Sequence, residues 1–310
     1  MKLAFVFPGQ GAQAPGMGQA LAAAFDPSRE IFAAADAALG FPLSEMCFAG
    51  TAEQLALTEN TQPAILTVSV AAWRALAERG IAPEAAAGHS LGEYSAHVAA
   101  GTLAFEDAVR AVRSRGRFMQ EAVPVGEGAM AAILGLDLDA VQDVCARVAD
   151  NQVVEAANIN APGQVVLAGH AAAVGRAVEA CREAGARRAV ELDVSAPFHS
   201  SLMRPAAERL EPVLAGIAFS DPGLPVYTNV DAAPVTAGAA ARDALVRQVA
   251  SPVLWLDLVR RMAADGFDTF VELGPGSVLS GLARRIDRSL KTVSVSDPAG
   301  LDKALETLGG

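Results

Sequence analysis

The stretch at residues 85–96 reads AAAGHSLGEYSA, and it limits most narrowly what this chain can fold into. Small apolar residues precede the pattern G-x-S-x-G at residues 88–92, and a helix-like run closed by Gly101 follows it. In that setting the pattern predicts a nucleophile elbow, a strand-to-helix turn that lifts the hydroxyl of Ser90 above a sheet. Glycines are needed because a Cβ at either position would meet the crossing strand or helix. The five residues alone leave open a glycine-flanked turn without chemistry.

A serine hydroxyl is a weak nucleophile unless a base lies beside it. The candidate base is His199, in the run FHSSLM at residues 198–203, where we expect a new helix with Ser200 as its N-cap. A helix N-terminus disfavours the imidazolium, so the pattern predicts a neutral, basic imidazole near pH 7. A purely structural histidine is the alternative. His89 adjoins the serine, but its side chain must leave the turn in another direction, so we interpret it as structural.

The helix expected over residues 105–122 carries one cation on the flank of its apolar face, Arg115. Arg110, Arg113 and Arg117 share the opposite side and are expected to be solvated. A cation turned toward a core needs an anion. Either a structural carboxylate pairs with Arg115, or the side chain awaits an anionic ligand, and a planar guanidinium suits a carboxylate in particular.

Composition and charge exclude several classes of function. The chain has 310 residues, of which 52% are hydrophobic, enough for one large domain or one large and one small domain. A net charge of -11 and a pI near 4.9 argue against nucleic-acid binding. No apolar run is long enough to cross a membrane, and the N-terminal run is too short for a signal peptide. We therefore expect a cytoplasmic protein with no membrane association.

Cysteines and histidines show no metal or disulfide pattern. The three cysteines are far apart and suggest free thiols in a reducing compartment. The four histidines lack metal-ligand spacing. We expect no metal and no cofactor.

A glycine-rich turn, PGQGAQ at residues 8–13, follows an apolar strand at residues 3–7. It lacks the lysine of a phosphate-binding loop and fits a dinucleotide fingerprint poorly. It is either an ordinary strand-to-helix turn or a loop that reaches the cleft of the serine. In the second case Gln10 would offer an N–H or its side chain to an oxyanion.

Strands and helices alternate on both sides of a segment with a different pattern. Outside that segment the alternation predicts an α/β fold, a large hydrolase-like domain with a mostly parallel sheet flanked by helices. Within it the order is β-α-β-β-α-β, a ferredoxin-like unit. The predicted ranges are 1–125 and 197–310 for the large domain and 126–196 for the inserted small subdomain. In the second part of the large domain, Ser251-Pro252 predicts the start of a helix.

Six stretches resemble the malonyl-CoA:acyl carrier protein transacylase family, in order and across essentially the whole chain. They are FPGQGAQ at 7–13, GHSLGEYSA at 88–96, RGRFMQ at 115–120, NAPGQVV at 160–166, FHSSLM at 198–203 and ELGPG at 272–276. No single stretch is specific, but together they are. An inserted ferredoxin-like unit is also a feature of that family.

The resemblance implies a catalytic dyad with an oxyanion hole. Ser90 corresponds to the nucleophile and His199 to the general base. The main chain of Gln248 corresponds to the group that orients the histidine, and the amides of Gln10 and Leu91 to the oxyanion hole.

The resemblance also implies how the acyl group is selected. Arg115 corresponds to the clamp on the free malonyl carboxylate. Phe198 resembles the malonyl-selecting version in related polyketide acyltransferase domains, since a bulky ring leaves little room for an extra methyl group.

The implied activity is ping-pong transfer of a malonyl group from malonyl-CoA to the phosphopantetheine thiol of holo acyl carrier protein, supplying fatty acid synthesis. Malonyl-CoA is a substrate and phosphopantetheine belongs to the carrier, so the resemblance implies no cofactor. We expect a monomer. The alternatives are a serine thioesterase or esterase, an acyltransferase of a polyketide pathway, and a non-enzymatic carrier-binding domain.

Overall fold

Strands form two sheets in residues 1–194 and 196–309, the part of the chain that the computed structural model describes. The larger sheet contains β1 (Leu3–Phe7), β2 (Ala85–Gly88), β7 (Val226–Tyr227), β8 (Pro234–Val235), β9 (Thr269–Leu273) and β10 (Lys291–Val295). Its order is β10-β9-β1-β2-β7-β8, and every neighbouring pair is parallel except β7 with β8. The predicted mostly parallel sheet is therefore confirmed.

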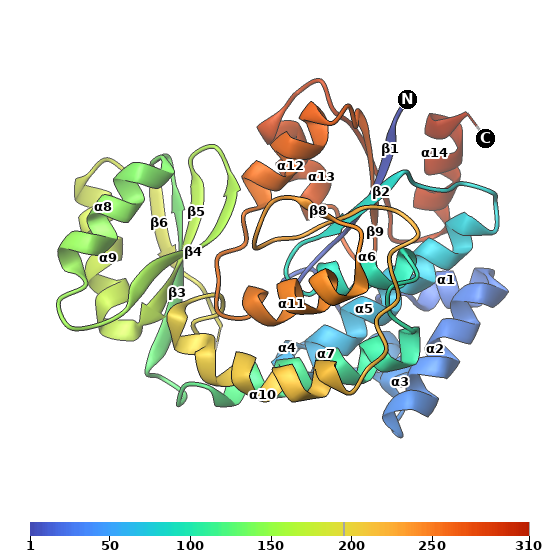
Figure 1. The fold of residues 1–310 in the computed structure, drawn as a ribbon, viewed down its shortest axis with the longest axis horizontal. Coiled ribbons are helices and arrows are strands. Elements are labelled where there is room, and N and C mark those ends of the chain that lie inside the picture. The colour runs from blue at the N-terminus through green and yellow to red at the C-terminus, as the bar shows by residue number, and fades with distance from the viewer. Residues whose placement is uncertain (195, 310) are drawn as a thin grey trace.

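Helices cover both faces of this sheet (Figure 1). They are α1 (Gln19–Ala24), α2 (Asp26–Leu39), α3 (Leu43–Ala49), α4 (Ala52–Ala56), α5 (Thr58–Ala77), α6 (Gly92–Ala99), α7 (Phe105–Glu121), α10 (Arg204–Ala215), α11 (Gly238–Gln248), α12 (Trp255–Ala264), α13 (Val278–Ile286) and α14 (Pro298–Leu308), with a 3-10 turn, η1, at Ser201–Met203. All five residues of β1 are buried because successive side chains enter opposite layers. Phe5 and Phe7 pack with α5 and α14, whereas Val6 packs with α12 and α13.

A second, antiparallel sheet lies to one side of the first (Figure 1). Its elements follow the order β3 (Gly128–Leu134), α8 (Leu138–Val148), β4 (Val154–Ala161), β5 (Gln164–His170), α9 (Ala171–Glu183) and β6 (Arg188–Glu191). The strand order is β4-β5-β3-β6, and α8 and α9 share one core with it. This is the predicted β-α-β-β-α-β sequence. The domain limits at 126 and 196 stay a prediction, and Ser195 and Gly310, which the predicted ranges include, lie outside the described residues.

Helices α5 and α7 pack closely enough to bring polar side chains from both into one site. A Cβ on Gly116 of α7 would lie 2.5 Å from the carbonyl oxygen of Thr58, so only glycine permits this approach. Nearly all of α5 is buried, in keeping with its largely apolar sequence. The helix begins at Thr58, so Pro63 lies inside it. Proline has no N–H, which costs one backbone hydrogen bond, and the packing of the buried helix offsets this loss.

Two local predictions are wrong. Pro252 does not begin a helix: α11 ends at Gln248, α12 begins at Trp255, and Val253 between them pairs with Asn158 of β4. Ser200 does not cap a helix with its side chain, because its hydroxyl donates to the carbonyl of Pro197. Ser200 and Pro252 thus lie in connecting segments, and contacts with distant residues determine the conformation of both segments.

Candidate active site

Three parallel strands deliver polar residues to one edge of the larger sheet. Strands β1, β2 and β7 are neighbours and run in the same direction, so their carboxyl ends lie together. Gln10, Ser90 and Asn229 follow these three ends within a few residues. Loops at the carboxyl edge of a parallel sheet are the usual place for a ligand site.

The elbow at Ser90 is sharp, as the glycines on either side of it predict. Ser90 has φ of 51°, in the left-handed region that residues with a side chain rarely occupy. A Cβ on Gly88 would lie 1.9 Å from the main chain of Gly92, and one on Gly92 would lie 2.0 Å from the carbonyl oxygen of Phe7. No side chain fits at either glycine, and α6 begins directly after the turn.

Asn229 holds the elbow in this conformation. Its Oδ1 accepts from the main-chain N–H of Ser90 at 2.6 Å, and its Nδ2 donates to the carbonyl of Gly88 at 2.7 Å. The side chain of Gln248 also donates to the carbonyl of Ser90, at 3.0 Å. Sequence reasoning missed Asn229, and its position just after a strand is the signal that could have suggested it.

His199 lies beside the serine in the orientation of a general base. Its Nε2 is 2.7 Å from Ser90 Oγ, and its Nδ1 is 3.0 Å from the carbonyl oxygen of Gln248. A carbonyl only accepts, so Nδ1 carries the proton and Nε2 is left to accept from the hydroxyl. The main-chain role expected of Gln248 therefore corresponds to the observed geometry.

The backbone around His199 is strained and held from two sides. His199 has φ of 63°, like Ser90 in the left-handed region. Next to it, the main-chain N–H and the hydroxyl of Ser201 donate to the two oxygens of Glu155, both at 2.8 Å. Glu155 belongs to β4, so the second sheet contributes directly to the position of the histidine loop.

Burial keeps His199 neutral. Loss of solvation and, second, the nearby Arg115 cation lower its pKa from 6.5 to about 3. The neutral state agrees with the sequence prediction, but the cause differs. A 3-10 turn and not an α-helix begins after Ser200, and burial dominates over any helix terminus.

Arg115 is buried next to the nucleophile and has no carboxylate partner. Only 1% of the residue is exposed. Its Nη1 donates to Oε1 of Gln62 at 2.9 Å, and its Nη2 donates to Oε1 of Gln248 at 2.8 Å and to Ser90 Oγ at 3.1 Å. Among residues 1–194 and 196–309 no ion pair involves this guanidinium, and its Nε lacks a hydrogen-bond partner. The alternative of a structural carboxylate in direct contact is wrong.

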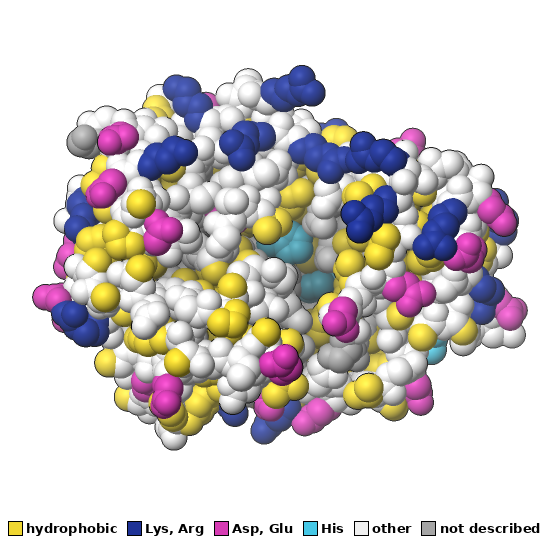
Figure 2. Space-filling model, turned by 180° about the vertical axis from the view of Figure 1, so that it is seen from behind, with side chains coloured by type: hydrophobic (Ala, Val, Ile, Leu, Met, Phe, Trp, Pro, Cys, Tyr) yellow, Lys and Arg dark blue, Asp and Glu magenta, His cyan; other side chains and the backbone are white. Residues whose placement is uncertain are grey.

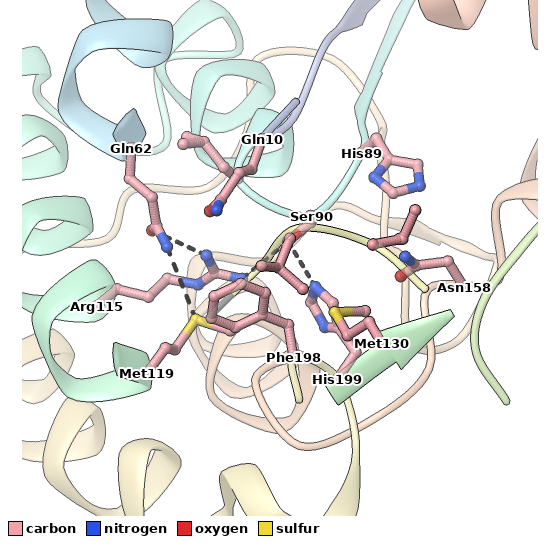
Figure 3. Close-up of a pocket in the computed structure, with 13 residues that line it drawn as sticks. Gln10, Gln62, His89, Ser90, Arg115, Met119, Met130, Asn158, Phe198 and His199 are labelled. Carbon is pink, nitrogen blue, oxygen red and sulfur yellow. Dashed lines mark hydrogen bonds between the residues drawn. The ribbon is translucent and has the colours of Figure 1, made fainter. Parts of the chain in front are cut away.

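These groups face a single cavity between the two sheets (Figure 3). Its walls include every predicted site residue except Gln248, whose side chain lies behind Arg115. Phe198 is buried and forms part of the apolar wall, together with Met119 of α7 and Met130 of β3. The cavity is therefore mainly apolar, with a serine, an imidazole and a guanidinium converging in it.

Two main-chain N–H groups at the cavity are free to receive an oxyanion. In the described part of the chain, neither the amide of Gln10 nor that of Leu91 donates to a protein atom. The side chain of Gln10 turns toward Thr58, with Nε2 3.4 Å from the Thr58 hydroxyl. Of the two donors that the sequence allowed for Gln10, the main-chain N–H is thus the uncommitted one.

His89 lies at the cavity wall but bonds away from the nucleophile. Its Nε2 is 2.9 Å from Oδ1 of Asn160, and its ring packs near Trp255, with 5.6 Å between ring centres. Burial lowers its pKa. This geometry agrees with its interpretation as a structural residue.

Metal-site clusters and membrane-spanning helices are both absent from residues 1–194 and 196–309. No group of three or more His, Cys, Asp or Glu side chains could hold a metal ion there. None of the described helices is both long and apolar enough to span a membrane.

Comparison with known proteins covers nearly the whole chain. The family model described as "Acyl transferase domain" matches residues 4–303. The malonyl CoA-acyl carrier protein transacylase of Bacillus subtilis is 49% identical over 308 residues, 99% of this chain and 97% of that protein. The enzyme of the same name from Escherichia coli K12 is 52% identical over 306 residues, 98% and 99% of the two chains.

Solved structures agree in fold. The acyl-carrier-protein S-malonyltransferase of Burkholderia pseudomallei matches with a TM-score of 0.96 at 51% identity, covering 99% of this chain and 100% of that one. A malonyl-transacylase solved in complex with its type II polyketide acyl-carrier protein matches with a TM-score of 0.97 at 48% identity, covering 99% and 100%. By sequence and by fold, this chain belongs to the malonyl CoA-acyl carrier protein transacylases of the acyl transferase family.

Proposed function

We propose that this protein transfers the malonyl group of malonyl-CoA to the phosphopantetheine thiol of an acyl carrier protein, through a malonyl ester on Ser90. One observation carries the proposal. The hydroxyl of Ser90 lies between the imidazole of His199, at 2.7 Å, and the guanidinium of Arg115, at 3.1 Å. A base and an unpaired cation thus meet at one nucleophile.

The short distance from Arg115 to Ser90 supports a short diacid as substrate. In a malonyl thioester one methylene separates the carbonyl carbon from the free carboxylate. A cation that binds this carboxylate while Ser90 attacks the carbonyl carbon must lie within a few ångströms of the attacking oxygen. Arg115 Nη2 does so. An acetyl group would leave the buried cation without an anion, which is costly and disfavours that substrate.

The first half-reaction forms the acyl-enzyme. His199 Nε2 takes the proton of Ser90 as Oγ bonds to the thioester carbonyl carbon. The amides of Gln10 and Leu91 donate to the oxyanion, and one such donor is typically worth on the order of 100-fold or more in rate. The C–S bond then breaks, and His199 returns the proton to the sulfur of coenzyme A.

The second half-reaction reverses these steps with another thiol. His199 accepts the proton of the phosphopantetheine thiol, and the sulfur bonds to the ester carbonyl carbon. The C–Oγ bond breaks and the proton passes from His199 to Ser90, which restores the free enzyme. The proposed steps involve only side chains and main-chain groups of this protein and the two thiols.

A basic cluster beside the cavity supports an acidic carrier as partner. Figure 2 shows histidine side chains in a hollow, with Lys and Arg side chains along one side of it. Arg284, Arg285 and Arg288 near the end of α13 are exposed, and Arg285 reaches Gln164 of β5 at 2.8 Å. The arginines on the solvent side of α7 are less available, because Arg110 pairs with Asp107 and Arg113 packs over the ring of Phe41. A local patch of this kind can offset the net charge of -11.

The proposal places the protein in the cytoplasm as a monomer that supplies malonyl groups for fatty acid synthesis. It binds neither nucleic acid nor membrane, as its acidic composition leads us to expect. The relative solved in complex with a type II polyketide carrier supports a carrier protein as acceptor and makes a polyketide carrier the alternative acceptor.

A partition experiment tests the proposal. The protein is loaded with malonyl-CoA, freed of excess substrate and divided between buffer and holo acyl carrier protein. We expect the malonyl group to leave quickly and appear on the carrier, while the sample in buffer keeps its adduct. Rapid release of free malonate in both samples would identify a hydrolase and contradict the proposal.

A further inference from the structure

Glu93 is an acidic side chain in the protein interior that the steps above do not use. It lies in the first turn of α6, three residues after the nucleophile, and none of its surface is exposed. Its Oε2 accepts from the main-chain N–H of Asn229 at 2.9 Å and from Nε2 of Gln248 at 2.7 Å. Burying a carboxyl group costs free energy, so its presence next to the site suggests a role there.

Glu93, at 2.7 Å, and the carbonyl of Ser90, at 3.0 Å, both accept from Nε2 of Gln248, and together they determine which way its amide points. A glutamine amide has a donor end and an acceptor end. Because Oε2 of Glu93 accepts from the donor end, Gln248 must present Oε1 on its other side, where Nη2 of Arg115 donates to it at 2.8 Å. A reversed amide would place its NH2 group against the guanidinium.

Gln62 shows the same arrangement on the other arm of Arg115. Its Nε2 points to the sulfur of Met119 at 3.8 Å, and its Oε1 accepts from Nη1 of Arg115. Figure 3 shows Gln62, Met119 and Ser90 around the guanidinium. Two glutamine oxygens therefore fix the plane of the guanidinium, and each is oriented by an acceptor behind it, a weak sulfur in one case and a carboxyl oxygen in the other.

We propose that Glu93 is a positioning residue for acyl-group selection: through the amide of Gln248 it holds the guanidinium of Arg115 where a malonyl carboxylate can meet it. This inference rests on the proposed function. Arg115 Nη2 donates both to Gln248 and to the nucleophile, so a change in the Gln248 amide alters the distance between the cation and Ser90. Glu93 itself touches neither the serine hydroxyl nor the cavity.

The acceptor oxygen of Glu93 matters for this role, and its charge does not. Burial raises the pKa of Glu93 to about 7, so both protonation states are accessible near neutral pH. Oε1 has no hydrogen-bond partner among the described residues and can carry the proton, while Oε2 accepts in either state. A glutamine at position 93 would keep an acceptor at that place, because the N–H of Asn229 requires one.

Two substitutions of similar length separate the acceptor from the charge. Glu93→Met removes both, and Glu93→Gln removes only the charge. The readout is the ratio of the rates at which malonyl-CoA and acetyl-CoA acylate the protein, measured by intact mass. A ratio is insensitive to the fraction of folded protein. Ser95→Ala is the matched control, since Ser95 is buried on the same helix and its hydroxyl has no hydrogen-bond partner in the described part.

We expect Glu93→Met to lower the malonyl-to-acetyl ratio by about tenfold or more. This is the size expected for loss of the hydrogen bond between Gln248 and the charged guanidinium of Arg115. Glu93→Gln and Ser95→Ala should stay within about threefold of the unaltered protein. If Glu93 acts through Gln248, Glu93→Met should add little to the change in ratio caused by Gln248→Met, whose main-chain carbonyl still orients His199.

An unchanged ratio in folded Glu93→Met would overturn the inference, and so would an equal loss in Glu93→Gln, which would point to charge. Independent effects of Glu93→Met and Gln248→Met would also contradict it. The proposed function fails separately, if the unaltered protein shows no preference for malonyl-CoA.

Discussion

Both residues of the proposed dyad have positive φ, 51° at Ser90 and 63° at His199. Such backbone costs of order 1–3 kcal/mol per residue, so neighbouring contacts must impose it. Asn229 and Gln248 hold the serine turn, and the clasp between Glu155 and Ser201 lies next to the histidine. The arrangement fixes the hydroxyl and the imidazole before any substrate arrives.

Sequence motifs were sufficient to find the three side chains that meet in the cavity, and insufficient to find those that hold them. Ser90, His199 and Arg115 lie in runs whose residue types are unusual together. Asn229 and Gln62 are ordinary polar residues in sequence, and their roles depend on distances across the fold. No local pattern predicts that a glutamine on α5 meets an arginine on α7.

Arg115→Ala tests acyl-group selection at the level of one residue. We expect the rate of acylation by malonyl-CoA to fall by on the order of 100-fold or more, while acetyl-CoA loses far less, because only the malonyl group has a carboxylate to pair. Arg115→Lys should be intermediate, since an ammonium keeps the charge but not the planar fork. Rapid-quench kinetics with both thioesters gives the comparison. Equal losses for both would show that Arg115 only maintains the fold.

At the level of elements, regular structure was predictable where packing follows the local pattern. The β-α-β-β-α-β order of the small subdomain is the one expected, and α7 ends one residue earlier than expected. The helix expected at Pro252 and the cap expected at Ser200 failed, because Val253 pairs with the second sheet and the Ser200 hydroxyl turns back to Pro197. Local capping signals do not reveal such long-range contacts.

Glycine substitutions test the close crossing of β1, β2 and α6. Gly92→Ala would place a Cβ 2.0 Å from the carbonyl oxygen of Phe7, so the elbow must shift, and we expect loss of acylation together with a lower unfolding midpoint. Gly175→Ala in α9 is the control. A Cβ there meets nothing within 4 Å, and we expect it to stabilise the protein by about 0.5–1 kcal/mol. Chemical denaturation and the acylation assay check both, and full activity in Gly92→Ala would contradict the described crossing.

At the scale of the whole molecule, the site depends on how the two sheets meet. The larger sheet supplies the loop of Ser90 and the proposed oxyanion donors, while Met130, Leu192 and Val194 from the second sheet region close the apolar wall. The chain order of elements predicted both sheets. The wall and the Glu155 clasp were not predictable, because the angle between two sheets is set by contacts that no single segment encodes.

Buried titratable groups give the whole molecule a pH-dependent stability. Burial lowers the pKa of His97 and His199 from 6.5 to about 3 and also lowers that of His89, so the unfolded chain binds protons that the native protein does not. Their contribution is present above pH 6.5 and is lost as the pH falls toward 3. Glu93, with its pKa raised to about 7, has the opposite slope between pH 4.5 and 7. Three histidines act in one direction and Glu93 alone in the other, so the histidines determine the sign of the net slope.

We therefore expect the free energy of unfolding to decrease between pH 6.5 and 4.5, with about 1.4 kcal/mol per pH unit for each net proton. Urea denaturation at fixed pH values measures this slope. His97→Gln should make the slope shallower, because it removes one of the buried imidazoles whose pKa is lowered. His97 does not line the cavity, so the substitution leaves the site in place. Stability that is constant or greater at pH 4.5 would contradict the assignment of neutral, buried imidazoles.

The most direct test of the account is the mass of the intact protein after exposure to malonyl-CoA, followed by peptide mapping, for the unaltered chain and for Ser90→Ala. We expect one added malonyl group, located on Ser90, and no addition to the variant. An adduct on another residue, or one that persists in Ser90→Ala, would contradict the claim that base, cation and nucleophile meet at this serine.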